Sequence, residues 1–70
     1  LAPLIRQEIW FCLERLKQAG QSILVVDKNV DALTRLADRH YVIEKGRVVW
    51  EGDSNALLAA PEIQRRYLGI

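Results

Sequence analysis

Asp27, Lys28 and Asn29 form a polar cluster at a place in the chain where ligand-binding residues are expected. They follow Ser22–Val26, a short apolar run rich in branched residues that is typical of a strand buried on both faces. Open α/β sheets bind their ligands at the carboxyl ends of such strands, so the cluster is a candidate ligand site. A second interpretation stays open, in which the cluster is only a strand end followed by a helix cap.

Other residues that could carry chemistry have simpler interpretations. His40 is a lone histidine at a strand start, where a surface or packing role is favoured over catalysis. Cys12 falls on the apolar side of a predicted helix, which indicates a small core residue. Trp10 and Trp50 could stack on a nucleotide base, but such residues more often pack at a domain edge or a partner surface. No Cys/His cluster predicts a metal site.

A phosphate-binding loop is missing from the sequence. The pattern Gly-x-x-x-x-Gly-Lys-Ser/Thr, whose backbone N–H groups and lysine hold nucleotide phosphates, does not occur. Asp27 is the one acidic residue that follows an apolar strand as a magnesium-holding carboxylate does. We therefore expect this chain alone neither to bind nor to hydrolyse ATP.

Periodicity and caps predict the elements that position the cluster. The first helix begins at Pro3, carries apolar residues at helical spacing and ends at Gly20 as a left-handed cap. A second, short helix follows Asn29 as its N-cap and Asp31 in its first turn. Its residues expected to be buried are Val30, Leu33, Leu36 and Ala37.

The second half of the sequence predicts a hairpin and two helices. A strand over His40–Glu44 leads through a tight turn at Lys45–Gly46 to an antiparallel strand over Arg47–Glu51. Ser54 is expected to cap a short helix, and Pro61–Gly69 contains a last helix with its glycine stop. The predicted fold class is α/β, with the order α-β-α-β-β-α-α.

Length and composition set limits on function. The 70 residues form one small domain or part of a larger one, and a chain this short hides only about 60% of its unfolded surface. Ten basic and nine acidic residues leave a net charge of +1, which argues against nucleic acid or an anionic membrane as partner. The chain has no methionine and opens on Leu1-Ala2-Pro3, as expected for part of a longer protein.

Four segments, taken in their order, resemble ABC transporter ATPases of the branched-chain amino-acid importer type. Leu1–Ile5 resembles the end of the D-loop, and Gln21–Val30 resembles the H-loop strand with its switch. Leu36–Val49 resembles the hairpin that follows, and Tyr67–Gly69 matches the usual closing Tyr-Leu-Gly. The resemblance covers essentially the whole chain, and the order and spacing of its pieces are specific.

The resemblance implies that residues 1–70 are the C-terminal fragment of a nucleotide-binding domain with a P-loop NTPase core. The longer protein would be an ATPase subunit that uses ATP and Mg²⁺ and pairs with a second ATPase subunit. It would drive membrane permease subunits that import branched-chain amino acids, from the cytoplasmic face of the cell membrane. The interface between the two ATPase subunits would include the D-loop residues Leu1, Ala2 and Pro3.

The resemblance also assigns the polar cluster. Lys28 would be the catalytic switch that faces the γ-phosphate, and Asp27 and Asn29 would shape the nucleotide-binding H-loop around it. Two positions depart from the family pattern: Ala2 stands where many cassettes carry an aspartate, and Lys28 where histidine or glutamine is usual. Lysine keeps a donor and adds a charge, but it offers no acceptor.

Two further expectations concern partners. A non-enzymatic small α/β module for dimerisation or docking is the alternative function. In the family's core sheet, strands outside this chain flank Ile23–Val26 on both sides, which leaves the strand's edges unpaired. We therefore expect either direct parallel pairing with His40–Glu44 or, as the favoured outcome, self-association of the chain.

Overall fold

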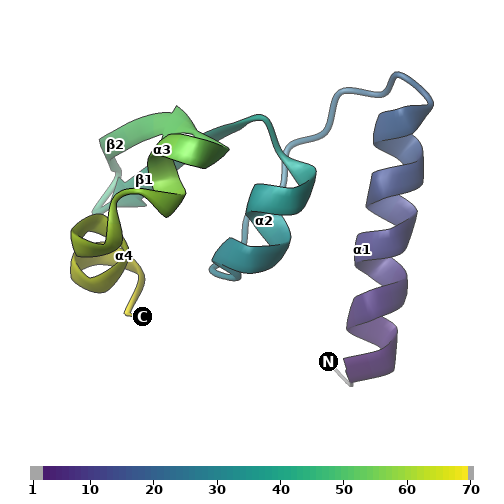
Figure 1. The fold of residues 1–70 in the computed structure, drawn as a ribbon, viewed down its shortest axis with the longest axis horizontal. Coiled ribbons are helices and arrows are strands. Elements are labelled where there is room, and N and C mark those ends of the chain that lie inside the picture. The colour runs from purple at the N-terminus through teal and green to yellow at the C-terminus, as the bar shows by residue number, and fades with distance from the viewer. Residues whose placement is uncertain (1–2, 70) are drawn as a thin grey trace.

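Helix α1 (Pro3–Gln18) lies at one side of the molecule in the computed structural model of this chain, which describes residues 3–69 (Figure 1). The proline stands at the first helical position, as predicted, where its missing N–H costs no hydrogen bond. Arg15 and Lys17 occupy the last turn, where cations favour a helix C-terminus. Gly20 follows with a φ of 88°, so the predicted left-handed stop is confirmed.

The apolar stripe of α1 is not a core surface in this structure, contrary to the prediction. None of residues 3–18 is buried, and Ile5, Ile9 and Leu16 are 44–50% exposed. Cys12 is exposed as well, so its predicted place in a core is wrong. The physical reason is that a helix stripe is buried only against a covering surface, and no strand of residues 3–69 lies against α1.

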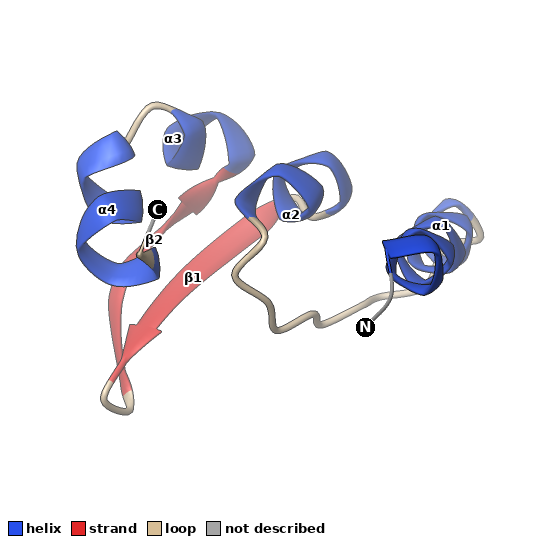
Figure 2. Cartoon of the chain, turned by 90° about the horizontal axis from the view of Figure 1, so that it is seen from below, coloured by secondary structure: helices blue, strands red, loops and turns tan. Residues whose placement is uncertain are grey.

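The segment after α1 is the main correction to the predicted fold. Residues 21–27 form no strand (Figure 2), so the order within residues 3–69 is α-α-β-β-α-α. Burial still alternates with a period of two: Ile23 and Val25 are half-buried, whereas Leu24 and Val26 are 92% and 93% exposed. The side chains thus keep the pattern of a strand, but no neighbouring strand is there to bond its backbone.

Helix α2 (Val30–Leu36) starts where the sequence predicts it. Asn29 is its N-cap, because the Asn29 side chain accepts a hydrogen bond of 3.1 Å from the Ala32 N–H. Val30 and Leu36 are buried, while the other two residues expected in the core, Leu33 and Ala37, are half-buried.

The predicted hairpin is confirmed. Strands β1 (Arg39–Glu44) and β2 (Arg47–Asp53) pair antiparallel, in a sheet of two strands within residues 3–69. Lys45 and Gly46 have φ values of 51° and 78°, the left-handed pair that a tight hairpin turn requires. The parallel pairing of Ile23–Val26 with β1 is not formed.

Two short helices close the chain, and they complete a small core. Asp53, not Ser54, caps α3 (Ser54–Leu58), because its carboxylate accepts a 2.7 Å bond from the Ala56 N–H. Helix α4 (Pro61–Leu68) ends at Gly69 with a φ of 70°. The buried apolar residues come from α2, β1 and the α3–α4 region; they are Val30, Leu36, Val42, Leu57 and Ala60. Among the helices of residues 3–69, none has the length and apolar character to cross a membrane.

Candidate functional site

The cluster of Asp27, Lys28 and Asn29 forms a short loop attached to the N-terminus of α2. The Asp27 carboxylate accepts hydrogen bonds from the Lys28 N–H at 2.6 Å and from the Asn29 N–H at 3.0 Å. The Asn29 side chain then caps α2 through the Ala32 N–H. The interpretation of Asn29 as a helix cap is therefore confirmed. The loop is held to α2 at both the side-chain and the backbone level.

Lys28 is the member of this loop whose side chain is open to an external ligand. It is exposed, and within residues 3–69 its amine makes no hydrogen bond or ion pair. The Asp27 carboxylate instead has one oxygen engaged by two backbone N–H groups, so its position is fixed by the loop itself. The hydrogen bonds thus hold Asp27 and Asn29 within the loop, whereas the Lys28 side chain extends from it without a partner among residues 3–69.

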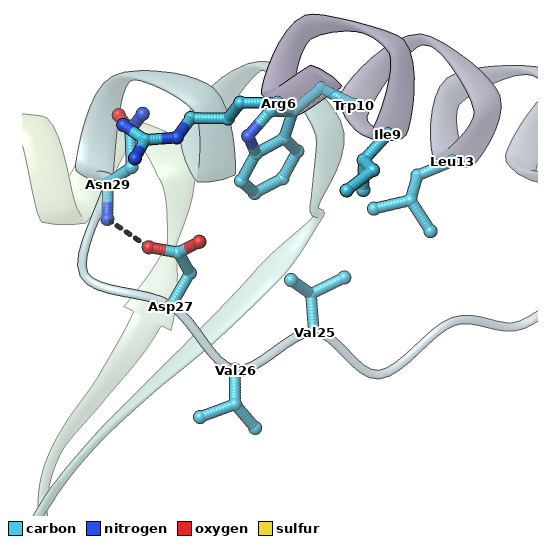
Figure 3. Close-up of a pocket in the computed structure, with 8 residues that line it drawn as sticks. All are labelled: Arg6, Ile9, Trp10, Leu13, Val25, Val26, Asp27 and Asn29. Carbon is cyan, nitrogen blue, oxygen red and sulfur yellow. Dashed lines mark hydrogen bonds between the residues drawn. The ribbon is translucent and has the colours of Figure 1, made fainter. Parts of the chain in front are cut away.

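A cleft of about 390 Å³ lies beside this loop, between α1 and residues 25–29. Figure 3 shows Trp10, Ile9 and Leu13 of α1 directed toward Val25. Arg6 extends along the cleft toward Asn29, and the remaining lining residues are Val26 and Asp27. In the apolar part of the cleft, the stripe of α1 meets the strand-like segment.

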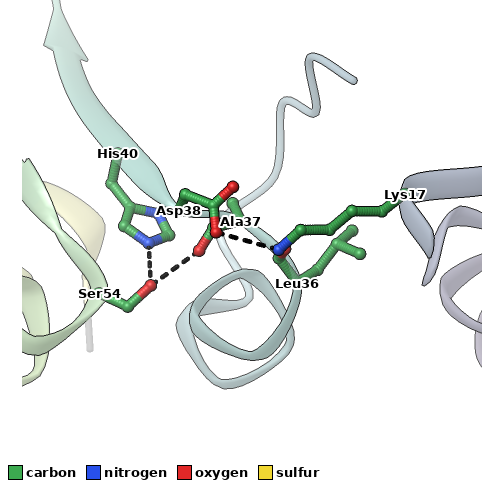
Figure 4. Close-up of polar contacts among 6 residues, drawn as sticks. All are labelled: Lys17, Leu36, Ala37, Asp38, His40 and Ser54. Carbon is green, nitrogen blue, oxygen red and sulfur yellow. Dashed lines mark hydrogen bonds and ion pairs between the residues drawn. The ribbon is translucent and has the colours of Figure 1, made fainter. Parts of the chain in front are cut away.

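A second polar group of residues, not singled out as a site from the sequence, lies at the opposite end of α2 (Figure 4). The Ser54 hydroxyl donates to the Ala37 carbonyl oxygen at 2.8 Å and lies 2.7 Å from His40 Nε2. Lys17 of α1 donates to the Leu36 carbonyl oxygen. Since a hydroxyl has one proton, which Ser54 gives to Ala37, His40 Nε2 is the donor in the His40–Ser54 bond.

His40 is a packing residue in this structure, as the sequence indicated. It is 7% exposed, and burial lowers the pKa of its imidazole, while the carboxylates of Asp53 and Asp38 act in the opposite direction. Nearby, the Lys17 amine forms a 3.1 Å ion pair with Asp38. These side chains are 39% and 83% exposed, so the ion pair contributes at most about 1 kcal/mol.

The remaining predicted positions are placed as follows. Leu1 and Ala2 lie outside the described residues, and Pro3 is the first residue of α1. Trp10 lines the cleft. The Trp50 ring covers Gly52, where an added Cβ would lie 2.7 Å from the ring. Within residues 3–69, no group of three His, Cys, Asp or Glu side chains is arranged to hold a metal ion.

Comparison of the sequence with known proteins finds homologues of one functional class. The sequence is homologous, over nearly its whole length, to ABC transporter ATP-binding proteins. It is 41% identical over 69 residues to the high-affinity branched-chain amino acid transport ATP-binding protein BraG of Pseudomonas aeruginosa, a match that covers 99% of this chain and 30% of BraG. The resemblance stated from the sequence is thereby confirmed.

Two further relatives broaden the class. A probable ABC transporter ATP-binding protein of Azorhizobium caulinodans is 36% identical over 67 residues, covering 96% of this chain and 24% of the relative. The thiamine import ATP-binding protein ThiQ of Escherichia coli is 32% identical over 71 residues, covering 100% of this chain and 31% of ThiQ. The chain thus spans less than a third of the length of these relatives. No protein-family model matches the chain, and no solved structure does.

Proposed function

We propose that residues 1–70 are the C-terminal part of the nucleotide-binding domain of an ABC-type ATPase subunit, and that this subunit serves an importer of branched-chain amino acids. The observation that carries the proposal is the 41% identity to BraG across 99% of the chain. The identity to the thiamine import protein is lower, at 32%. The predicted hairpin, present here as β1 and β2, supports the assignment of the chain to this region.

In the proposed subunit, Lys28 is the switch residue at the γ-phosphate of ATP. Phosphoryl transfer depends mainly on positioning and on electrostatic stabilisation of the transferred group. An exposed amine on a loop tied to a helix is suited to donate a charge-assisted hydrogen bond to a phosphate oxygen. Lysine offers no acceptor, so Lys28 orients and stabilises charge but takes no proton from the attacking water.

Asp27 and Asn29 keep Lys28 in place through their hydrogen bonds to the backbone. One Asp27 oxygen already accepts two backbone hydrogen bonds, and the Asn29 oxygen caps α2. This sequence contains no phosphate-binding loop, so that loop and the carboxylate that holds Mg²⁺ would belong to the rest of the subunit. Leu1, Ala2 and Pro3 would lie at the interface with a second ATPase subunit, and the pair would act on permease subunits from the cytoplasmic side of the membrane.

A chimeric ATPase tests this proposal. The aligned region of BraG is replaced by residues 1–69 of this chain, and the chimera is assembled with its transport partners. We expect ATP hydrolysis and uptake of leucine in cells that lack BraG. A second chimera with Lys28→Ala serves as the matched control and should hydrolyse ATP more slowly. If the first chimera folds and assembles but hydrolyses no ATP, the chain is a docking module and the proposal is wrong.

The branched-chain specificity has a test of its own. The same 69 residues are placed in the thiamine import protein ThiQ, and both chimeras are compared with their parents for uptake of their own solutes. We expect the BraG chimera to retain the larger fraction of its parent's uptake. Equal retention in the two chimeras would refute the assignment to branched-chain amino acids and leave only the ABC ATPase assignment.

A further inference from the structure

The end of α2 remote from the Lys28 loop is held by two neighbouring parts of the fold. Lys17 reaches from the last turn of α1 to the Leu36 carbonyl oxygen, and Ser54 reaches from α3 to the Ala37 carbonyl oxygen at 2.8 Å. The two donors approach from opposite sides of the helix end (Figure 4). The last carbonyl groups of a helix have no partner inside the helix, so these donors satisfy acceptors that would otherwise face solvent.

The Ser54 bond has its own support. Ser54 gives its proton to Ala37, and the His40 Nε2–H, on β1, donates to the Ser54 oxygen at 2.7 Å. His40 is buried, so its ring is held by the surrounding side chains and fixes the direction of the hydroxyl. One side of the α2 terminus is therefore attached to both β1 and α3, and the other side to α1.

The N-terminal end of α2 is bonded directly to the Lys28 loop. Asn29 bonds α2 twice, through its side-chain oxygen to the Ala32 N–H and through its carbonyl oxygen to the Leu33 N–H at 2.9 Å. The Asp27 carboxylate then fixes the backbone of Lys28. Seven helical residues span only about 10 Å, so a displacement of one end of α2 is transmitted to the other.

We propose that Lys17 and Ser54, the latter oriented by His40, are positioning residues that set where the Lys28 loop lies by clamping the C-terminal end of α2. The predicted loss of ATP hydrolysis rests on the proposed function, whereas the predicted displacement of the Lys28 loop does not. Lys17 and Ser54 touch neither the loop nor a ligand; they act through α2. Loss of either bond lets α2 shift on its apolar contacts and takes Lys28 away from the phosphate.

The test uses the BraG chimera with the substitutions Ser54→Ala and Lys17→Met, which remove one donor each and keep most of the side-chain volume. Lys17→Met also removes the exposed ion pair with Asp38. Thr34→Val is the matched control, because the Thr34 hydroxyl bonds only to carbonyl groups of α2 itself, those of Val30 and Asp31. Hydrogen–deuterium exchange of the peptide that spans residues 27–33 is the first readout. Each clamp variant should exchange there roughly three- to tenfold faster, the change expected for one net hydrogen bond.

Steady-state kinetics are the second readout. Each clamp variant should lower kcat about three- to tenfold, with the KM for ATP changed less than twofold, because the loop and not the main nucleotide grip is displaced. Ser54→Thr and Lys17→Arg should recover most of the rate. Unchanged exchange at residues 27–33 in both clamp variants overturns the clamp, whatever the activity. Faster exchange in chimeras that never hydrolyse ATP supports the clamp and contradicts the proposed function, so the two failures are distinguishable.

Discussion

The unpaired segment that follows α1 should make the isolated chain self-associate, and Leu24→Lys should prevent it. Leu24 and Val26 are 92% and 93% exposed on the same side of a segment with no strand neighbour in residues 3–69. Burial of such a side chain stabilises an association by about 1.5–3 kcal/mol. A symmetric dimer buries both side chains from both copies, roughly 6–12 kcal/mol in all.

The cost of association decides the strength of this dimer. Loss of translational and rotational freedom costs about 4–15 kcal/mol, which cancels much of the gain from burial. Backbone hydrogen bonds between the two segments add roughly 0.5–1.5 kcal/mol each. With mid-range values and about four to six such hydrogen bonds, roughly 4–5 kcal/mol remains in favour of the dimer, which corresponds to a dissociation constant of roughly 0.1–1 mM. The chain should therefore be monomeric at low micromolar concentration and dimeric near 1 mM.

Sedimentation equilibrium measures the dissociation constant of the dimer. Chain concentrations from about 10 μM to about 1 mM cover the expected range. Leu24→Lys should keep the chain monomeric throughout. Ile43→Lys is the matched control, because Ile43 is also exposed, at 66%, but lies on the hairpin. The wild-type chain could instead stay monomeric and melt cooperatively at about 1 mM, which is of the order of the weakest expected dissociation constant. That result would refute self-association through this segment. Dissociation by Ile43→Lys instead of Leu24→Lys would move the contact to the hairpin.

Three further predictions concern the nucleotide, the switch and pH. Calorimetry of the isolated chain should detect no specific ATP binding, because the sequence lacks a phosphate-binding loop; micromolar affinity would contradict this. In the full ATPase, Lys28→Ala should lower kcat far more than it raises the KM for ATP, by about 2–4 kcal/mol of barrier, as steady-state kinetics can measure. Burial lowers the pKa of His40 below its ordinary value of 6.5, so the folded chain binds the imidazole proton less readily than the unfolded chain.

The sign of the pH effect follows from that difference. The contribution of His40 to stability is complete above pH 6.5 and is lost as the pH falls through the lowered pKa. Urea midpoints measured from pH 7.5 to about pH 5 should therefore fall, and His40→Gln should show a smaller fall. A wild-type midpoint that rises on acidification would show that the nearby carboxylates, and not burial, control the imidazole.

Local signals in the sequence were sufficient to predict the helices and the hairpin. Pro3 and Gly20 bound α1 through their backbone conformations, and Asn29 begins α2 through its side-chain cap. The Lys45–Gly46 pair determines the hairpin turn. Such features depend on neighbours only a few residues away, so a short chain retains them.

The failures have a common physical cause. Ser22–Val26 has the composition of a buried strand, but a strand exists only through hydrogen bonds to a neighbour. The same reasoning applies to Cys12, which needs a surface opposite α1 before it is buried. Local pattern predicts which residues can enter a core, and the remainder of the domain decides whether they do.

The candidate site shows a similar division. Asn29 could be predicted as a cap from residue type alone, whereas the contacts of Ser54 and Lys17 join positions 17 and 19 residues apart in sequence. Ser54 was predicted to cap α3, yet the preceding residue Asp53 does so. With Asp53 as the cap, the Ser54 hydroxyl is available to bond the end of α2. No local signal in the sequence distinguishes those two arrangements.

The distribution of buried residues also determines how the chain comes apart. All the buried residues that the structure describes lie between Val30 and Ala60, and α1 contributes none. Detachment of α1 breaks the Lys17 bonds to Leu36 and Asp38 but exposes only side chains that are already half-exposed, such as Trp10 and Leu13. Its free energy is therefore smaller than that of global unfolding. A protease that cleaves between α1 and α2 should therefore act before the rest of the chain unfolds, and the Val30–Gly69 portion would be the resistant product.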